Sequence, residues 1–187
     1  IAYLKNDLIY IYEVIFMFST FKRDAGIWIR EIRENPIKML LAPCALLLIA
    51  FLFRIFSGST TNLYSLLVCK GFFPGAFWYM LGHILRIFCA GLMLTGVLFC
   101  RGLFELRLKA FACTAVICLV LLIEYRIIFV SVSPILALLL CAASLAAAFL
   151  SMMLFLKTCC PGAFPSLLFL LFQCIFLIQL ISLCAAL

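Results

Sequence analysis

The sequence contains few charged residues and one histidine. Of its 187 residues, 14 are Lys or Arg and 7 are Asp or Glu, so 11% are charged, whereas soluble globular proteins have about 25%. A soluble globular domain is therefore excluded. The net charge of +7 does not indicate a nucleic-acid-binding protein, because the basic residues are scattered between apolar runs and form no patch with interleaved aromatic residues.

Motifs for metal binding and catalysis are also missing. The eleven cysteines form no CxxC pair and no Cys/His cluster with zinc spacing. No HExxH, GxSxG, paired-carboxylate or phosphate-cradling glycine motif is present. No period of 20 to 50 residues repeats, which argues against transporters built from tandem or inverted repeats. We therefore predict a protein that is not an enzyme and that has no catalytic residues, no metal site and no tightly bound cofactor.

Long apolar runs make up most of the chain, which is 69% hydrophobic with a mean hydropathy of +1.35. About 20 apolar residues, rising about 1.5 Å each, span the hydrocarbon core of a bilayer. Five runs are long enough. The predicted fold class is an all-α integral membrane protein in which residues 39–187 form a bundle of five transmembrane helices. The predicted spans are residues 39–56, 74–100, 110–130, 132–156 and 163–187.

Residues 1–38 are predicted to form an N-terminal interfacial segment. Residues 1–21 are apolar, but Lys5, Asp7 and Glu13 leave too short an uninterrupted stretch to span comfortably. The stretch from 22 to 38 is amphipathic and any helix in it should end at Pro36. In the loop at 57–73, residues 63–68 can form a short helix over the end of the bundle.

Basic residues predict the orientation. Six Lys or Arg residues lie in the N-terminal segment, three in the loop at 101–109 and one at Lys157, against Arg54 and Lys70 on the other side. Because cytoplasmic loops carry an excess of Lys and Arg, we place the N-terminus in the cytoplasm and the loop at 57–73 outside. The expected location is the bacterial plasma membrane.

The second span carries ionisable residues, which are costly inside a bilayer. Tyr79, His83 and Arg86 follow i, i+4, i+7 spacing and so share one side of a helix. Glu124 in the third span differs in depth from His83 by roughly 4 to 5 Å and from Arg86 by about 9 Å. Either cation could keep the carboxylate ionised. We expect Glu124 to be paired, with His83 preferred.

Two interpretations of this cluster stay open. In one, an outward-opening cavity between the second and third spans, under the loop at 57–73, is lined by Trp78, Tyr79, His83 and Glu124. In the other, the polar groups only fix the register of the helices. Gln173 and Gln179 in the fifth span are expected to bond to a neighbouring helix for under about 1 kcal/mol. Small residues in the fourth span suit close packing within the chain or between subunits.

Several of these stretches resemble those of a known family. They are F-P-G-A-F-W opening the second span, Ser57-Gly58 after the first span, Tyr64 in the long first loop, Pro74-Gly75, and L-I-E-Y-R-I-I-F at 122–129. Together with the five spans, they resemble the TspO/MBR family of tryptophan-rich sensory or translocator proteins. Glu124 stands where that family has Asn, and the Pro-Tyr and Trp of its fifth span are absent here.

The resemblance implies a homodimeric membrane receptor or transporter for tetrapyrroles, such as a porphyrin or haem, or for sterol-like molecules, with the pocket under the first loop. The ligand-binding residues expected on this basis are Phe77, Trp78, Tyr79, His83, Glu124 and Tyr64. The expected partners are the lipid bilayer, a hydrophobic small molecule and a second copy of the chain. The alternatives are a substrate-binding membrane subunit of a multi-protein transporter and a non-catalytic membrane assembly protein.

Overall fold

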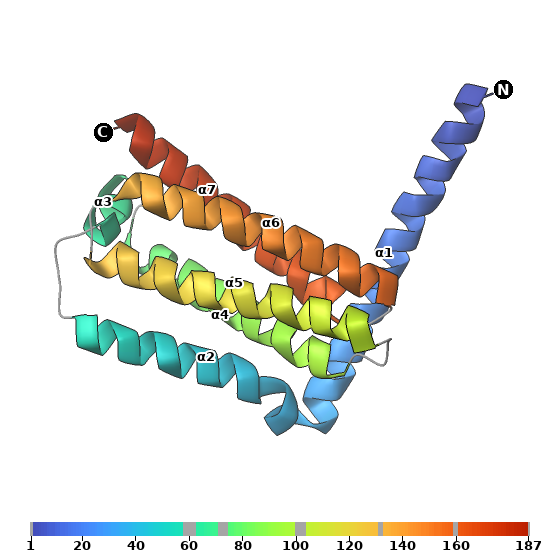
Figure 1. The fold of residues 1–187 in the computed structure, drawn as a ribbon, viewed down its shortest axis with the longest axis horizontal. Helices are drawn as coiled ribbons and strands as arrows, with labels where there is room; N and C mark the ends of the chain where they lie inside the picture. Colours follow the sequence, from blue (N-terminus) through green and yellow to red (C-terminus); the bar gives the residue numbers. More distant parts are fainter. Residues whose placement is uncertain are drawn as a thin grey trace.

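The computed structural model describes residues 2–57, 63–70, 75–99, 104–130, 133–158 and 161–186, with the side chains of all of these except 2–11, 57, 129 and 130. These residues form helices and no strand, which confirms the all-α class (Figure 1). The helices are α1 (Ala2–Glu34), α2 (Pro36–Ser57), α3 (Leu63–Lys70), α4 (Ala76–Leu98), α5 (Phe104–Val130), α6 (Pro134–Thr158) and α7 (Ala163–Ala186).

Five of these helices, α2, α4, α5, α6 and α7, are long and apolar enough to cross a membrane, as predicted. Some predicted features lie outside the described residues. They are the span ends at 74, 100, 132 and 187, and Gly58 and Pro74 of the family resemblance. Residues 104–109, predicted as part of a basic loop, belong to α5. Glu, Leu, Arg and Lys are good helix formers, so this helix continues past its apolar stretch.

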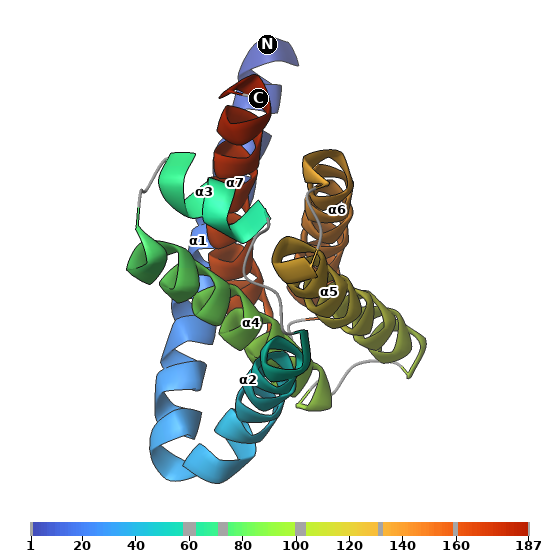
Figure 2. The same ribbon diagram turned by 90° about the vertical axis from the view of Figure 1, so that its left-hand side faces the viewer.

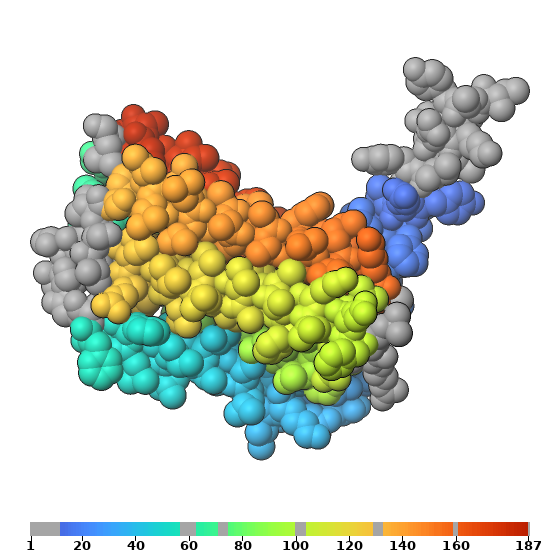
Figure 3. Space-filling view, in the orientation of Figure 1, coloured from blue at the N-terminus to red at the C-terminus, as the bar shows by residue number. Residues whose placement is uncertain are grey.

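Helix α4 is the central helix of the bundle. It packs against α2, α5 and α7, while α6 packs against α5 and α7 (Figure 2). In its membrane-crossing stretch 61% of the residues are buried, compared with 17% in α2. The space-filling view shows α5 lying between α6 and α2 on one face of the molecule (Figure 3). Polar side chains on α4 are therefore enclosed by other helices.

Glycines allow α4 to approach its neighbours closely. A Cβ added at Gly91 would overlap the backbone of Pro43 in α2. One added at Gly96 would lie 2.6 Å from the carbonyl oxygen of Pro161, before α7. Because real Cβ atoms do not come this close to backbone atoms, these two positions have no room for a side chain.

A different helix lies at each end of the bundle (Figure 1). At one end, α3 buries Leu63 and Leu67 and contacts α4, α5 and α7, which confirms the short helix predicted in this loop. Gly75 joins α3 to α4: its N–H donates to the carbonyl of Val68 at 3.2 Å. Its φ of 132° is a conformation that glycine adopts at little cost.

At the other end lies α1, a single helix that covers residues 2–34 of the predicted N-terminal segment and ends just before Pro36, while residues 36–38 begin α2. Its N-terminal part points away from the bundle (Figure 1). Its C-terminal part is anchored by Trp28, which is buried beside Met39 of α2 and Leu92 of α4. Asp24 is also fully buried and accepts a hydrogen bond from the N–H of Ala163, the first residue of α7. The interfacial location of this segment stays a prediction.

Candidate functional site

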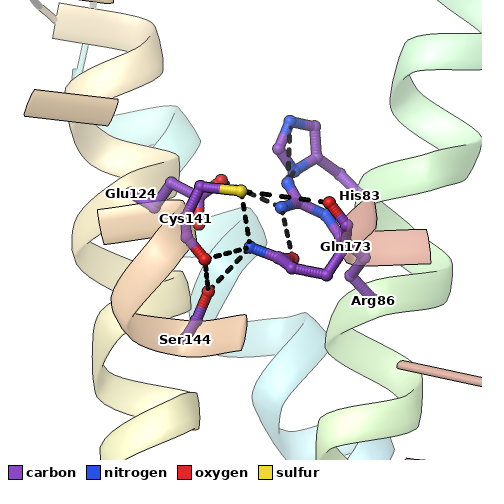
Figure 4. A network of polar contacts seen from close by, with 6 residues as sticks. All are labelled: His83, Arg86, Glu124, Cys141, Ser144 and Gln173. Atoms are coloured by element: carbon purple, nitrogen blue, oxygen red, sulfur yellow. Dashed lines mark hydrogen bonds and ion pairs between the residues drawn. The ribbon is translucent and has the colours of Figure 1, made fainter. Parts of the chain in front are cut away.

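Arg86 is the centre of a buried polar network in the middle of the bundle (Figure 4). Its Nη1 donates to Oε1 of Glu124 on α5 and to Oε1 of Gln173 on α7, both at 2.9 Å. Its Nη2 donates to Nδ1 of His83, one turn earlier on α4. A guanidinium group is only a donor, so Nδ1 must accept, and a neutral His83 ring carries its proton on Nε2.

Gln173 extends the network to α6 (Figure 4). Its Nε2 donates to Oγ of Ser144 at 2.7 Å and lies 3.2 Å from Sγ of Cys141. The Ser144 hydroxyl in turn donates to the carbonyl of Cys141 at 2.9 Å. One continuous set of polar contacts therefore joins α4, α5, α6 and α7.

The charges within this network are balanced and almost fully enclosed. The side chains of Arg86 and Glu124 are 2% and 1% exposed, and the Cζ of Arg86 lies 3.8 Å from the centroid of the Phe176 ring. Oε2 of Glu124 and the hydroxyl of Tyr79 are buried with no hydrogen-bond partner in the described structure. Buried ion pairs give little net stability, but losing one partner is costly.

The expectation that Glu124 is paired is confirmed, but the preference for His83 as its partner is wrong. The cation is Arg86, whose guanidinium lies between the carboxylate and the imidazole (Figure 4). The difference in depth of about 9 Å along the helices is spanned because the arginine side chain is long. Arginine also keeps its charge when buried, which histidine does not.

Three of the predicted ligand-binding residues meet at one cavity of about 220 Å³ between α4 and α7. Its lining consists of Trp78, Tyr79, Leu81, Gly82, His83, Leu85, Arg86, Phe172, Ile175, Phe176 and Gln179. The cavity was expected between the second and third spans, but it lies between the second and the fifth. Glu124 does not line it and reaches it only through Arg86.

The two other predicted residues are also outside this lining. Phe77 is 70% exposed and its ring contacts that of Trp78, with centroids 5.5 Å apart. The ring of Tyr64, on α3, lies 5.2 Å from that of Tyr79. Each therefore contacts a residue of the cavity wall without lining the cavity itself.

A second cavity, of about 260 Å³, also has His83 in its wall. It is formed between α2, α4 and α5 by Leu47, Ala50, Phe51, Arg54, Met80, His83, Ile84, Ile87 and Tyr125. His83 lines both cavities, and its ring is packed edge-on against the rings of Tyr79, Tyr125 and Phe176.

Sequence reasoning missed the part of the network on α6 and α7. Gln173 was visible as a polar residue in an apolar span, but it was assigned only a generic interhelical bond. Nothing in the sequence distinguishes Ser144 and Cys141 from the other small residues of the apolar fourth span. Their roles depend on which face of α6 turns toward Gln173, and span-by-span reading does not give that rotation.

The fold and the site together define the class of the protein: a helical integral membrane protein with an enclosed, charge-balanced network beside an apolar cavity. Within the described ranges, no three His, Cys, Asp or Glu side chains are grouped so that they could hold a metal ion. Comparisons of the chain with protein-family models, curated proteins and solved structures found no match.

Proposed function

We propose that the protein is a membrane receptor or carrier that binds a small hydrophobic molecule in the cavity between α4 and α7. The observation that carries this proposal is the position of the cavity directly beside the buried network, with Arg86 and His83 in its wall. Ligand sites are typically apolar hollows with a few well-placed polar groups. A network that served packing alone would need no such hollow.

The volume of the cavity favours a ligand of one or two rings. Ligand pockets usually measure about 300 to 1,000 Å³, while an apolar cavity of about 150 Å³ holds benzene. At about 220 Å³, the space is small for the tetrapyrrole or sterol-like ligand that the TspO/MBR resemblance implies. Stacking surfaces for a flat ring are offered by Trp78, Phe172 and Phe176.

The proposal also includes the family, the homodimer and the membrane orientation expected from the sequence. Membership of the TspO/MBR family is supported by the motif residues, among them Trp78 and Tyr79 in the cavity wall. A homodimer is supported by the exposed alanines of α6, Ala142, Ala143 and Ala146, because small residues let two helices approach closely. A cytoplasmic N-terminus in a bacterial plasma membrane is supported by the basic residues alone.

A thermal-shift screen tests this function. Purified protein is screened with protoporphyrin, haem, cholesterol and naphthalene derivatives, and the screen is repeated on Trp78→Ala. A ligand that binds the folded state must raise the melting temperature, and we expect that rise to shrink in Trp78→Ala. Phe149→Ala is the matched control, because Phe149 is as exposed as Trp78 but lies on α6, outside the cavity. If no compound stabilises the wild type, the proposal fails.

The joining of four helices by a single buried network favours a second candidate, a non-catalytic assembly protein in which the network only holds the bundle together. In that case His83→Ala and Glu124→Ala would each lower the melting temperature. A ligand would still raise the melting temperature of each variant by as much as it raises that of the wild type.

A further inference from the structure

The cavity between α2, α4 and α5 follows the long axis of two neighbouring helices (Figure 2). Its wall contains one stripe of residues from each helix, namely Leu47, Ala50, Phe51 and Arg54 on α2, and Met80, His83, Ile84 and Ile87 on α4. Both stripes follow i, i+3, i+4, i+7 spacing, which is one side of a helix over two turns. Seven residues rise about 10 Å along a helix axis. The cavity is therefore elongated in the direction in which the helices cross the membrane.

A positive charge marks one end of this cavity. Arg54 lies in the last turn of α2, two residues before the end of the membrane-crossing stretch at Phe56, and its side chain is exposed. Its Nη1 contacts Sδ of Met80, the first residue of the α4 stripe, at 3.3 Å. Arginines near the ends of spans reach the bilayer interface, where lipid phosphates lie. No Asp or Glu lines the cavity, so its charged end is positive.

The rest of the cavity is mostly apolar and meets the surface that faces lipid. Phe51 and Ile84 line it and are 58% and 44% exposed. Helix α2 has the lowest buried share of the five membrane-crossing stretches. An empty hollow forfeits dispersion contacts for the atoms around it. The apolar molecules that can enter from this side are the acyl chains of the bilayer.

We propose that this cavity binds one acyl chain of a glycerophospholipid while Arg54 binds the phosphate of the same molecule. The inference goes beyond the proposed function, because it concerns another cavity and another ligand. An apolar cavity of about 150 Å³ holds the six carbons of benzene. The volume of about 260 Å³ therefore has room for about ten carbons of a chain.

The guanidinium of Arg54 can bind a phosphate without leaving its present place. Besides the contact with Met80, it has a hydrogen bond with the side chain of Tyr125, which also lines the cavity. A guanidinium has five N–H donors, and its fork matches the oxygens of a phosphate. The headgroup and the chain are thus bound by separate parts of one site.

Native mass spectrometry of the full chain, released from mixed micelles, tests both parts. The probes are dimyristoyl phosphatidylglycerol, dimyristoylglycerol, which has the chains but no phosphate, and glycerol 3-phosphate, which has a phosphate but no chains. We expect the phospholipid to bind at least about tenfold more tightly than either control, because a charge-assisted hydrogen bond is added to apolar burial. Equal binding of the phospholipid and dimyristoylglycerol, or of the phospholipid and glycerol 3-phosphate, would overturn the inference.

Arg54→Met tests the phosphate contact. It should weaken binding of the phospholipid about tenfold and leave dimyristoylglycerol unchanged. Arg126→Met is the matched control, because Arg126 is an exposed arginine near the same end of the bundle and does not line the cavity. Equal losses in the two variants would mean that the lipid belongs to a general annulus around the protein, and the inference would fall.

Ile84→Trp tests the binding of the chain. A larger side chain at this position fills the cavity and should weaken binding of both the phospholipid and dimyristoylglycerol. Ile123→Trp is the control, because Ile123 is 42% exposed, about as much as Ile84, and lies outside the cavity. Both effects are measured on folded protein, so a loss of stability does not imitate them. Unchanged binding in Ile84→Trp would contradict the proposed position of the chain, whatever the thermal-shift screen shows for the α4/α7 cavity.

Discussion

The protein buries two carboxylates in two different ways. Glu124, inside the membrane-crossing bundle, is held by the Arg86 guanidinium at 2.9 Å, and both side chains are almost fully buried. Asp24, on α1, is equally buried but its cation, Arg23, is half-exposed and 3.8 Å away. Its closer partner is the N–H of Ala163 at the start of α7. A carboxylate in hydrocarbon needs a full opposite charge, whereas one at the end of the bundle is supported by a helix N-terminus.

The largest expected effect comes from removing the cation of the inner pair. Arg86→Met leaves Glu124 with no partner charge and should destabilise the protein by about 3 to 5 kcal/mol. Arg86→Met combined with Glu124→Leu removes both charges and should recover most of that loss. Reversible unfolding in mixed micelles measures both. A double variant no more stable than Arg86→Met would show that the pair is not the cause.

A smaller effect distinguishes the tight packing around α4 from the open surroundings of α1. Gly91→Ala places a methyl group where the backbone of Pro43 lies, and overpacking of this kind costs about 1 to 3 kcal/mol. Gly26→Ala on α1 is the control, because nothing lies within 4 Å of its added Cβ. It should be stabilising by up to about 1 kcal/mol. Equal effects on the unfolding free energy would mean that α2 shifts to make room.

The smallest effect concerns Asp24 and depends on pH. Burial raises the pKa of the Asp24 carboxyl, and the Arg23 guanidinium and the backbone N–H groups of α7 offset this only in part. The folded protein therefore binds this proton more tightly than the unfolded chain does. The contribution of Asp24 to the free energy of unfolding is greatest below the pKa of the unfolded chain, about 3.9. It is lost as the pH rises through the raised pKa of the folded protein.

Asp24→Asn, whose amide does not ionise, should remove this dependence. Its melting temperature relative to the wild type should increase as the pH rises from about 4 toward neutrality. The melting temperatures of the two proteins, followed over this range, provide the measurement. Parallel curves would show that Asp24 is not the group responsible.

The fold could be predicted from the sequence further than the site. The lengths of the apolar runs were enough to give five spans, and a polar loop containing Leu63 to Val68 was enough to suggest α3. Tyr79, His83 and Arg86 were correctly placed on one side of a helix, and Glu124 at a reachable depth. These conclusions depend only on distance along the chain.

The partner of Glu124 could not be predicted, because it depends on how each helix is rotated about its axis. Neighbouring spans were expected to form the cavity, since helices joined by a short loop usually pack together. The cavity beside Arg86 instead lies between α4 and α7, which are distant in sequence, while a second cavity lies between α2, α4 and α5. Hydrophobicity is high along the whole of α7, so no polar stripe in the sequence marks the side of this helix that faces α4.

The imidazole of His83 has a further consequence, because within the described structure it is the one side chain common to the walls of both hollows. Replacing this imidazole by a smaller side chain would therefore widen both hollows at once, the one beside α7 and the one between α2 and α5.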